Sequence, residues 1–385
     1  MISLRSREAF EKEEAERLAP FAVRSLESKG RLVPEPEHPY RTAFQRDRDR
    51  VVHSRAFRRL QYKTQVFVHH EGDHYRNRLT HTLEGAQIAR TMARSLRLNE
   101  DLCEAIALAH DLGHTPFGHA GERVLARLLA DEGGFDHNRQ SLRVVDWIEE
   151  RYPEFRGLNL SEETREGMCK HGCDWDHPVA LPRLGLQRHL ESQVADISDE
   201  IAYINHDLDD GLNAGVLALE ALADEPLWRT VSDQVEARSS RAHVKIHAAQ
   251  TIVALINRLV GDVLEASHAV LLERKVDSAD VARQSEEPLI RFSDEVARQV
   301  LALKRFLSEN FYHHPRVMRM TRKAEWIVGD LYRVFSDDPL LLPRRIRDRF
   351  RDEPPARVTA DYLAGMTDRF AMAEHRKLLD PHAPA

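Results

Sequence analysis

The sequence has few of the residues that disulfide-rich, disordered or β-rich proteins use. Its 385 residues include three cysteines, 17 glycines and 17 prolines. Cys103, Cys169 and Cys173 are too few for a disulfide framework, and they indicate a reducing compartment. The low glycine and proline content, with leucine and alanine at helical spacing, argues against a disordered or β-rich chain.

Long apolar runs are also lacking. A helix that spans a bilayer needs about 20 consecutive apolar residues, and no uninterrupted run approaches that length. The N-terminal segment MISLRSREAFEKEEAERL has no apolar stretch of the kind that a secretory signal contains. The net charge of −7 gives no overall attraction to nucleic acid or to an acidic membrane. We therefore expect a cytoplasmic protein with no membrane partner.

One segment is locally basic. Residues 41–59 (RTAFQRDRDRVVHSRAFRR) contain seven arginines with two aspartates between them. The interleaved acids make a salt-bridged surface or a subunit contact at least as good an interpretation as a phosphate-binding track. Single-stranded nucleic acid is therefore only a weakly supported partner.

Helical periodicity covers most of the chain, so we expect an all-α fold: one large helical domain with a C-terminal helical lobe. The expected helices are 3–30 (ending at Gly30), 42–60, 79–98, 101–110, 120–131, a segment from about 139, 189–223, 243–274, 285–310 and 317–335. Proline or glycine interrupts the pattern at 33–39, 111–119 and 133–134. Residues 153–186 are less regular, residues 61–75 allow a short extended hairpin, and the tail PHAPA is expected to be disordered. Asn99 stands where an N-cap would satisfy the first donors of the following helix.

Histidine is unusually frequent. The chain has 21 histidines, and eight of them fall between residues 69 and 137. Imidazole is the commonest transition-metal ligand in proteins and titrates near neutral pH. His110 and Asp111 are adjacent at the end of an apolar helix and just before a glycine turn, where both side chains can converge on one ion. Without supporting residues, such a dipeptide would be read as a surface pair.

The neighbouring segments supply that support. They are RNRLTHTLEGAQIAR with His81, HDLGHTPFGHAGE, FDHN, and ADISDEIAYINHDLDDG. In the last segment Asp199, Tyr203 and Asp207 lie at i, i+4 and i+8, so they share one helix face. In this order the segments resemble the HD-domain superfamily, in particular the deoxyguanosine triphosphate triphosphohydrolase-like branch of dNTP triphosphohydrolases. The resemblance covers residues from about 41 to about 335.

The resemblance implies an HD-domain helical fold with three parts. Residues 1–40 are expected to be an N-terminal charged helix and proline-rich linker, and residues 41–225 the HD catalytic core. Residues 226–380 would complete the substrate pocket and make oligomer contacts. The implied activity is metal-dependent hydrolysis of dGTP or mixed dNTPs to a deoxynucleoside and inorganic triphosphate.

The resemblance also implies a metal site of His81, His110, Asp111 and Asp199. Asp196, one turn earlier, is the alternative to Asp199 as the last metal ligand. We prefer Asp199 because the family pattern places a tyrosine four residues and an acid eight residues after the ligand, and only Asp199 is followed in this way, by Tyr203 and Asp207. Such a donor set accommodates Mn²⁺, Fe²⁺, Ni²⁺, Co²⁺ or Zn²⁺, and also Mg²⁺ with added waters.

His119 and Glu122, one helical turn apart, would perform proton transfer at the scissile bond. His114 and His137 resemble histidines that approach the triphosphate, for which a purely structural role is the alternative. Arg78, three residues before His81, resembles a phosphate clamp.

The remaining implied contacts face the sugar or the phosphates. Gln65 resembles a glutamine near the 3′-hydroxyl, and Tyr203 and Asp207 resemble sugar-facing residues, the tyrosine ring rejecting a ribose hydroxyl. Tyr312 resembles a tyrosine of the sugar or base pocket, and Lys304 takes the place of a basic phosphate contact. For the last two, a core tyrosine and a surface lysine are equal alternatives.

Other interpretations stay open. Cys169, His171, Cys173 and His177 lie within nine residues and form a weak zinc-site candidate. A different HD phosphohydrolase, either a nucleotidase or a phosphodiesterase, is the alternative enzyme, and a nucleotide- or single-stranded nucleic-acid-binding protein is the alternative of another class. The resemblance further implies a homo-oligomer, a hexamer or tetramer, with an activating dNTP at its subunit interfaces.

Overall fold

The structure is a computed structural model that describes residues 4–66, 75–170, 172, 175–238 and 243–383. Over these residues it contains helices and no strand, which confirms the expected all-α class. The helices are α1 Arg7–Arg17, α2 Ala43–Val52, α3 Arg55–Arg59, α4 Arg78–Ser95, α5 Glu100–Ala109, α6 His119–Leu128, α7 His137–Arg143, α8 Glu162–Met168, α9 Leu190–Asn213, α10 Leu219–Leu222, α11 Pro226–Arg238, α12 Val244–Glu273, α13 Ala279–Arg283, α14 Asp294–Leu307, α15 Pro315–Asp337, α16 Arg344–Arg347, α17 Pro355–Ala364 and α18 Asp368–Leu379.

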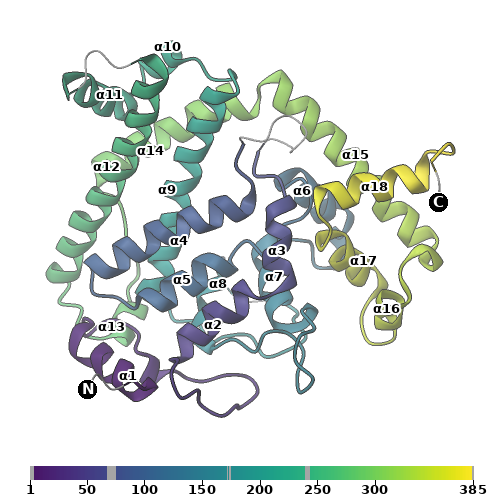
Figure 1. The fold of residues 1–385 in the computed structure, drawn as a ribbon, viewed down its shortest axis with the longest axis horizontal. Coiled ribbons are helices and arrows are strands. Elements are labelled where there is room, and N and C mark those ends of the chain that lie inside the picture. Colours follow the sequence, from purple (N-terminus) through teal and green to yellow (C-terminus); the bar gives the residue numbers. More distant parts are fainter. Residues whose placement is uncertain (1–3, 67–74, 171, 173–174, 239–242, 384–385) are drawn as a thin grey trace.

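The centre of the molecule is built on α4, which lies across α9 and against α5 (Figure 1). Asn77 caps α4 by accepting from the Thr80 amide. Asn99 caps α5 by accepting from the Leu102 amide, as the sequence predicted. Because these caps fix where the two helices begin, they also fix which residues face the helix α9.

The expected helix over 3–30 is wrong beyond Arg17. Pro20 has no amide donor and disfavours a helical residue before it, so the chain turns at Leu18. The turn folds back on α1, where the Glu14 carboxylate accepts from the Ser25 amide at 2.8 Å and the Ser25 hydroxyl at 2.9 Å.

The structure tests the remaining fold predictions only in part. The predicted hairpin lies partly in residues 67–74, outside the described part of the chain, and an antiparallel bridge joins Thr64 to Asn77 beside it. Helices α8, α11, α13 and α16 to α18 were not predicted. The proposed division at residues 40 and 225 stays a prediction.

Two apolar clusters form the interior of the described chain. The larger includes residues of α2, α4, α5, α9, α12 and α14. The smaller joins α6 to α15, α17 and α18, with Val124, Leu125, Val328 and Leu363 among its buried members. The C-terminal helices therefore pack on α6 and hold its first turn in place.

Asp368, at the start of α18, ties these two parts together. Its buried carboxylate accepts from the Thr64 amide at 2.9 Å, from the Thr64 hydroxyl, and from the Phe117 amide at 2.8 Å. Beside it, the buried Lys63 ammonium donates to the carbonyls of Ala364, at 2.9 Å, and His114. Burial, aided by nearby arginines, lowers the pKa of Lys63 to about 7. Hydrogen bonds thus hold the segments that precede α4 and α6 against the turn between α17 and α18.

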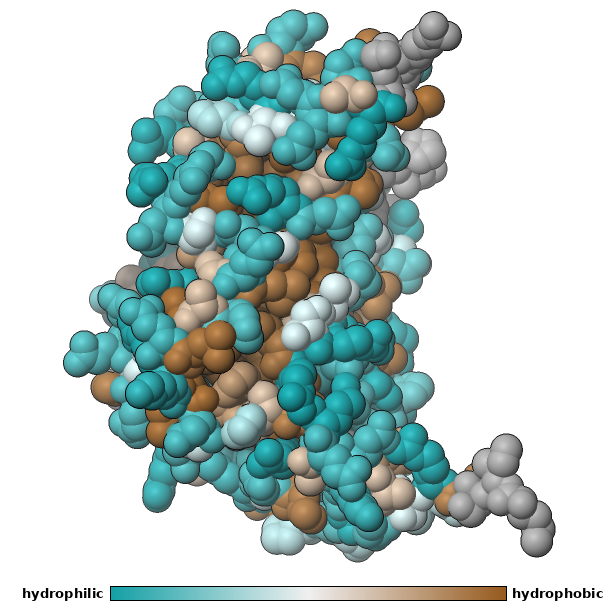
Figure 2. Space-filling view, turned by 90° about the vertical axis from the view of Figure 1, so that its left-hand side faces the viewer, coloured by the Kyte–Doolittle hydropathy of each residue, from teal (hydrophilic) through white to brown (hydrophobic). Residues whose placement is uncertain are grey.

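One face leaves apolar side chains exposed. Figure 2 shows the side of the molecule that bears α12, with apolar residues gathered across its middle. On α12 itself Val244, Ile246, Val253 and Leu272 are exposed. Exposed apolar patches are typical of protein contacts, but the homo-oligomer stays a prediction. None of the helices in the described ranges has the length and apolar character that crossing a membrane requires.

We predict that Asp368→Ala lowers the free energy of unfolding by about 3 kcal/mol, because two backbone amides and a hydroxyl lose a buried charged acceptor. Urea denaturation monitored by circular dichroism measures this change. Asp380→Ala, whose half-exposed carboxylate lies 3.7 Å from Arg376, is the matched control and should change stability by less than about 1 kcal/mol. Equal effects of the two substitutions would contradict the role given to Asp368.

Candidate active site

Three helices and one turn bring the predicted metal ligands together. His81 lies in the first turn of α4, His110 ends α5, Asp111 begins the following turn, and Asp199 lies in α9. The turn passes close to α7, since a Cβ on Gly113 would lie 2.1 Å from the Ser141 amide nitrogen. Only glycine fits there, which explains the glycine that follows the His-Asp pair.

The donor atoms of His81, His110 and Asp199 converge, and Asp111 lies beside His110. The Asp199 Oδ1 atom lies 2.9 Å from His81 Nε2 and 3.4 Å from His110 Nε2, and Asp111 Oδ1 lies 3.2 Å from His110 Nε2. His81, His110 and Asp199 form one of the two described groups that could hold a metal ion. Asp196, the competing residue, pairs instead with Arg188.

The tautomer of His110 is set by the backbone. Its Nδ1 lies 2.7 Å from the Ala107 carbonyl and must donate a proton there, so Nε2 is the ring nitrogen that faces Asp111 and Asp199. This Nε2 atom is buried and has no hydrogen-bond partner among the described residues. An orphaned imidazole nitrogen beside two carboxylates is what a divalent metal site requires before the ion binds.

The electrostatics favour a cation at the same point. Burial lowers the pKa of His110, but Asp111 and Asp199 more than offset it and raise that pKa to about 9. Burial also raises the pKa of both carboxyls, yet the His110 charge and other cations hold the pKa of each well below its usual range. The donor set therefore stabilises positive charge, and the residues present fit a divalent ion.

His206, which sequence reasoning missed, orients His81. The two Nδ1 atoms lie 2.9 Å apart, and the far nitrogen of His206 contacts Glu84. Outer partners of this kind fix the orientation of a ligating ring. The signal was present in the sequence, because His206 lies seven residues after Asp199, two turns along the same face of α9.

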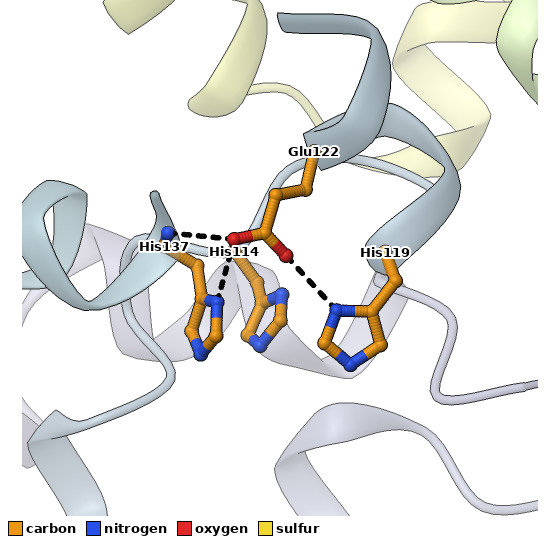
Figure 3. A group of neighbouring side chains, drawn as sticks. All are labelled: His114, His119, Glu122 and His137. Carbon is orange, nitrogen blue, oxygen red and sulfur yellow. Dashed lines mark hydrogen bonds and ion pairs between the residues drawn. The ribbon is translucent and has the colours of Figure 1, made fainter. Parts of the chain in front are cut away.

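A second group surrounds Glu122, at the start of α6. Its Oε2 lies 2.9 Å from His119 Nδ1, and its Oε1 lies 2.8 Å from His137 Nδ1 and accepts from the His137 amide at 2.9 Å (Figure 3). The rings of His114 and His137 stack with centroids 3.9 Å apart. His119 remains 51% exposed in its side chain, so its far nitrogen is accessible to a ligand.

Asp111 joins the two groups. Its Oδ1 atom lies 3.2 Å from the Nε2 atoms of both His110 and His114, and its Oδ2 accepts from Arg78 at 2.9 Å. Arg78 can approach because Gly118 has no side chain: a Cβ there would lie 2.8 Å from the guanidinium. The buried Asp111 carboxylate therefore contacts three features. It contacts His110 of the metal group (His81, His110 and Asp199), His114 of the histidine group (His114, His119, Glu122 and His137), and Arg78, the predicted phosphate clamp.

A third group joins α9 to the π-helical turn Ser308–Tyr312 that follows α14. Tyr312 donates to the Asp207 carboxylate, and the rings of Tyr203 and Tyr312 stack with centroids 6.2 Å apart. Burial raises the pKa of Asp207 to about 8, helped by Asp210 and opposed by the Tyr312 hydroxyl. The structure thus brings together three of the four residues expected at the sugar, and Gln65 is the fourth.

Two predicted contacts remain, Gln65 and Lys304. Gln65 has a buried Oε1 without a partner among the described residues, while Lys304 pairs at 2.7 Å with Glu200, the neighbour of Asp199. Lys170, which was not predicted, lies 3.3 Å from Asp199 Oδ2. In the zinc candidate, His171 and Cys173 lie outside the described residues, and His177 contacts Asp146 at 2.9 Å.

Comparison with known proteins is consistent with this architecture. Residues 78–204 match the HD domain, and residues 290–377 match the phosphohydrolase-associated domain. The chain is 50% identical to a deoxyguanosinetriphosphate triphosphohydrolase-like protein of Ralstonia pickettii over 94% of each chain. A protein of the same name from Geobacter sulfurreducens is 49% identical, over 95% of this chain and 96% of that one. The corresponding Bordetella pertussis protein is 50% identical, over 94% and 96% respectively.

The raised pKa of Asp207 gives a pH prediction. Between about pH 4 and about pH 8 the unfolded chain has lost the Asp207 proton while the folded protein keeps it, so this residue lowers stability as pH rises. Asp207→Asn should therefore be more stable than the wild type by a margin that grows by about 1.4 kcal/mol per pH unit. Urea denaturation across this range measures the margin. Tyr312→Phe, which removes only the hydroxyl donor, should not reduce the pH dependence, and a constant margin for Asp207→Asn would refute the assignment.

Proposed function

The chain belongs to the deoxyguanosinetriphosphate triphosphohydrolase-like family of HD-domain phosphohydrolases, and from this we propose that it hydrolyses dNTPs to a deoxynucleoside and inorganic triphosphate. The observation that carries the proposal is the position of Asp111. Its carboxylate contacts the metal group on one side and the histidine group on the other. A phosphorus atom held between the two groups would meet both a site for a nucleophile and a proton donor.

His81, His110, Asp111 and Asp199 would hold a divalent ion, with Mn²⁺ or Mg²⁺ first among the candidates. When bound, such an ion polarises a phosphoryl oxygen and supplies a nucleophilic water near neutral pH. His206 and the Ala107 carbonyl keep the two imidazoles turned toward it. The divalent ion would replace the proton that otherwise satisfies His110.

His119 would protonate the leaving group. Its Nδ1 faces Glu122, which orients the ring, so Nε2 can give a proton to the 5′-oxygen. In the balanced reaction the bond between the α-phosphorus and the 5′-oxygen breaks, the oxygen of water joins the phosphorus, and the proton from His119 completes the deoxynucleoside hydroxyl. The attacking water releases a proton to solvent, and His119 takes up a proton from solvent before the next turnover.

The remaining residues would bind the substrate. Arg78, His114 and His137 surround the position where the phosphates would lie, next to Asp111. Lys304 would approach the phosphates by leaving Glu200.

At the sugar, Gln65 would contact the 3′-hydroxyl through its unsatisfied amide oxygen. Tyr203, Tyr312 and Asp207 would close the pocket around C2′, so that a ribose hydroxyl finds no space. Activation by a second dNTP stays a prediction.

We predict that His119→Ala and Glu122→Gln lower kcat for dNTP hydrolysis by roughly 10²–10⁴-fold, because each removes part of the proton donor. Anion-exchange separation of the products, from each dNTP singly and in mixtures with Mn²⁺ or Mg²⁺, measures both rate and product. Arg123→Ala, an exposed position on the same helix that pairs with Glu325 at 3.4 Å, is the control and should retain activity. Release of orthophosphate or of a monophosphate by the wild type would favour a different HD phosphohydrolase.

We also predict that Asp199→Ala lowers Mn²⁺ affinity by at least 100-fold, whereas Asp196→Ala leaves it within a few-fold of the wild type. Asp199 belongs to the converging donor set, and Asp196 is occupied by Arg188. Titration calorimetry of metal-free protein with MnCl₂ measures both affinities. The reverse ranking would make Asp196 the ligand.

A further inference from the structure

His81 and His206 meet through two ring nitrogens that hold one proton between them. Their Nδ1 atoms face each other at 2.9 Å, and the rings meet edge to face, with centroids 5.1 Å apart. Both side chains are buried. A nitrogen pair at this distance shares a single proton, because one atom must donate and the other must accept.

Glu84 determines which of the two nitrogens carries that proton. Its carboxylate contacts Nε2 of His206. An ionised carboxylate only accepts hydrogen bonds, so Nε2 of His206 must carry a proton. A second proton on the same ring would place a cation beside the divalent ion of the proposed metal site, which like-charge repulsion disfavours. His206 is therefore neutral, its Nδ1 has a lone pair, and the shared proton belongs to His81.

This assignment sets the state of the other nitrogen of His81. Because Nδ1 of His81 donates to His206, the neutral ring has at Nε2 the lone pair that a metal ligand needs. Nε2 faces Asp199 Oδ1 at 2.9 Å, within the converging donor set. If the shared proton belonged to His206 instead, the neutral His81 ring would carry its own proton on Nε2 and would present an N–H group to the ion.

Arg76 keeps Glu84 in its ionised form. The Arg76 Nε donates to Glu84 Oε2 at 2.9 Å, and its Nη1 donates to Asp209 at 2.6 Å and to Asp210 at 3.1 Å. Although burial raises the pKa of Glu84, the contacts with His206 and Arg76 lower it to about 2. The Glu84 side chain is 39% exposed, so a residue near the surface fixes the position of a hydrogen between two buried rings.

We propose that Glu84, held by Arg76, is a positioning residue that selects the metal-binding tautomer of His81 through His206. This role rests on the proposed metal site and adds the residues that prepare one of its ligands. Glu84 and His81 lie one turn apart on α4, whereas His206 lies on α9, so the hydrogen bonds also cross the contact between these two helices. The direction of each bond follows from the acceptor-only group at the outer end.

The affinity for Mn²⁺ tests this role. Titration calorimetry uses MnCl₂ as the probe and the full chain after EDTA treatment and dialysis. Glu84→Met keeps the length of the side chain and removes the acceptor, so it should bind Mn²⁺ at least tenfold more weakly. Glu84→Gln, whose amide oxygen still accepts from His206, should recover most of that loss. Glu104→Met changes a glutamate of α5 that pairs with Arg48 and Arg90, and it should bind as the wild type does.

Nitrogen-15 NMR of histidine-labelled protein measures the proton positions directly and without any metal. Protonated and unprotonated ring nitrogens have well separated chemical shifts, and His206→Gln identifies the His206 signals by their loss. In the wild type, His206 should carry its proton on Nε2. In Glu84→Met a measurable fraction should carry it on Nδ1, and Glu84→Gln should restore the wild-type pattern. A role of Glu84 in packing alone would leave these shifts unchanged.

The two measurements separate this role from the proposed function. Unchanged Mn²⁺ affinity or an unchanged His206 pattern in Glu84→Met, shown to be folded by circular dichroism, would overturn the role of Glu84 and leave the metal site standing. A wild-type His206 protonated on Nδ1 would overturn it without any variant. Absence of Mn²⁺ binding by the wild type would instead contradict the metal site, while the NMR pattern would still establish whether Glu84 sets the proton positions.

Discussion

The buried carboxylate of Asp111 is the charge around which the candidate site is arranged. Burying an ionised carboxyl group is costly unless hydrogen bonds and opposite charges compensate it. Here the compensation comes from Arg78 on α4, at 2.9 Å, from His110 at the end of α5, and from His114 in the turn, each at 3.2 Å. These partners belong to different elements. Compensating the one buried charge of Asp111 therefore fixes both the packing of α4 on α5 and the path of the turn.

A second buried carboxylate extends this order to the C-terminal helices. Asp368 contacts the segments before α4 and before α6, and the smaller apolar cluster presses α15, α17 and α18 on the helix that carries His119 and Glu122. The His119–Glu122 pair is therefore held by residues more than 200 positions away. Removing the C-terminal helices would remove the packing that holds His119 and Glu122. The metal donors lie on α4, α5 and α9, which pack in the larger apolar cluster, and they would keep their positions.

Local signals could be read from the sequence, and long-range ones could not. The helices at 79–98 and 101–110 were predicted because their apolar spacing is regular and Asn99 caps the second. The helix predicted over 3–30 is wrong because the chain stops being helical before Pro20 and does not continue to Gly30. The contact of Asp207 with Tyr312, and that of Lys63 with Ala364, depend on how distant helices cross. Periodicity carries no information about such crossings, so their residues could be named only by resemblance or not at all.

The arginines show how one residue type takes different roles in one chain. Arg165 makes two 2.8 Å hydrogen bonds to Asp146, and Arg143 is paired with Asp361, so their donors are largely used and they hold the fold together. Arg78 donates to Asp111 at 2.9 Å, and its buried Nε has no hydrogen-bond partner among the described residues. A guanidinium that the fold has satisfied has little left to offer a ligand, whereas an unsatisfied one gains most from a polyvalent anion. The number of spare donors, rather than the number of arginines, is therefore what separates a structural charge cluster from a binding site.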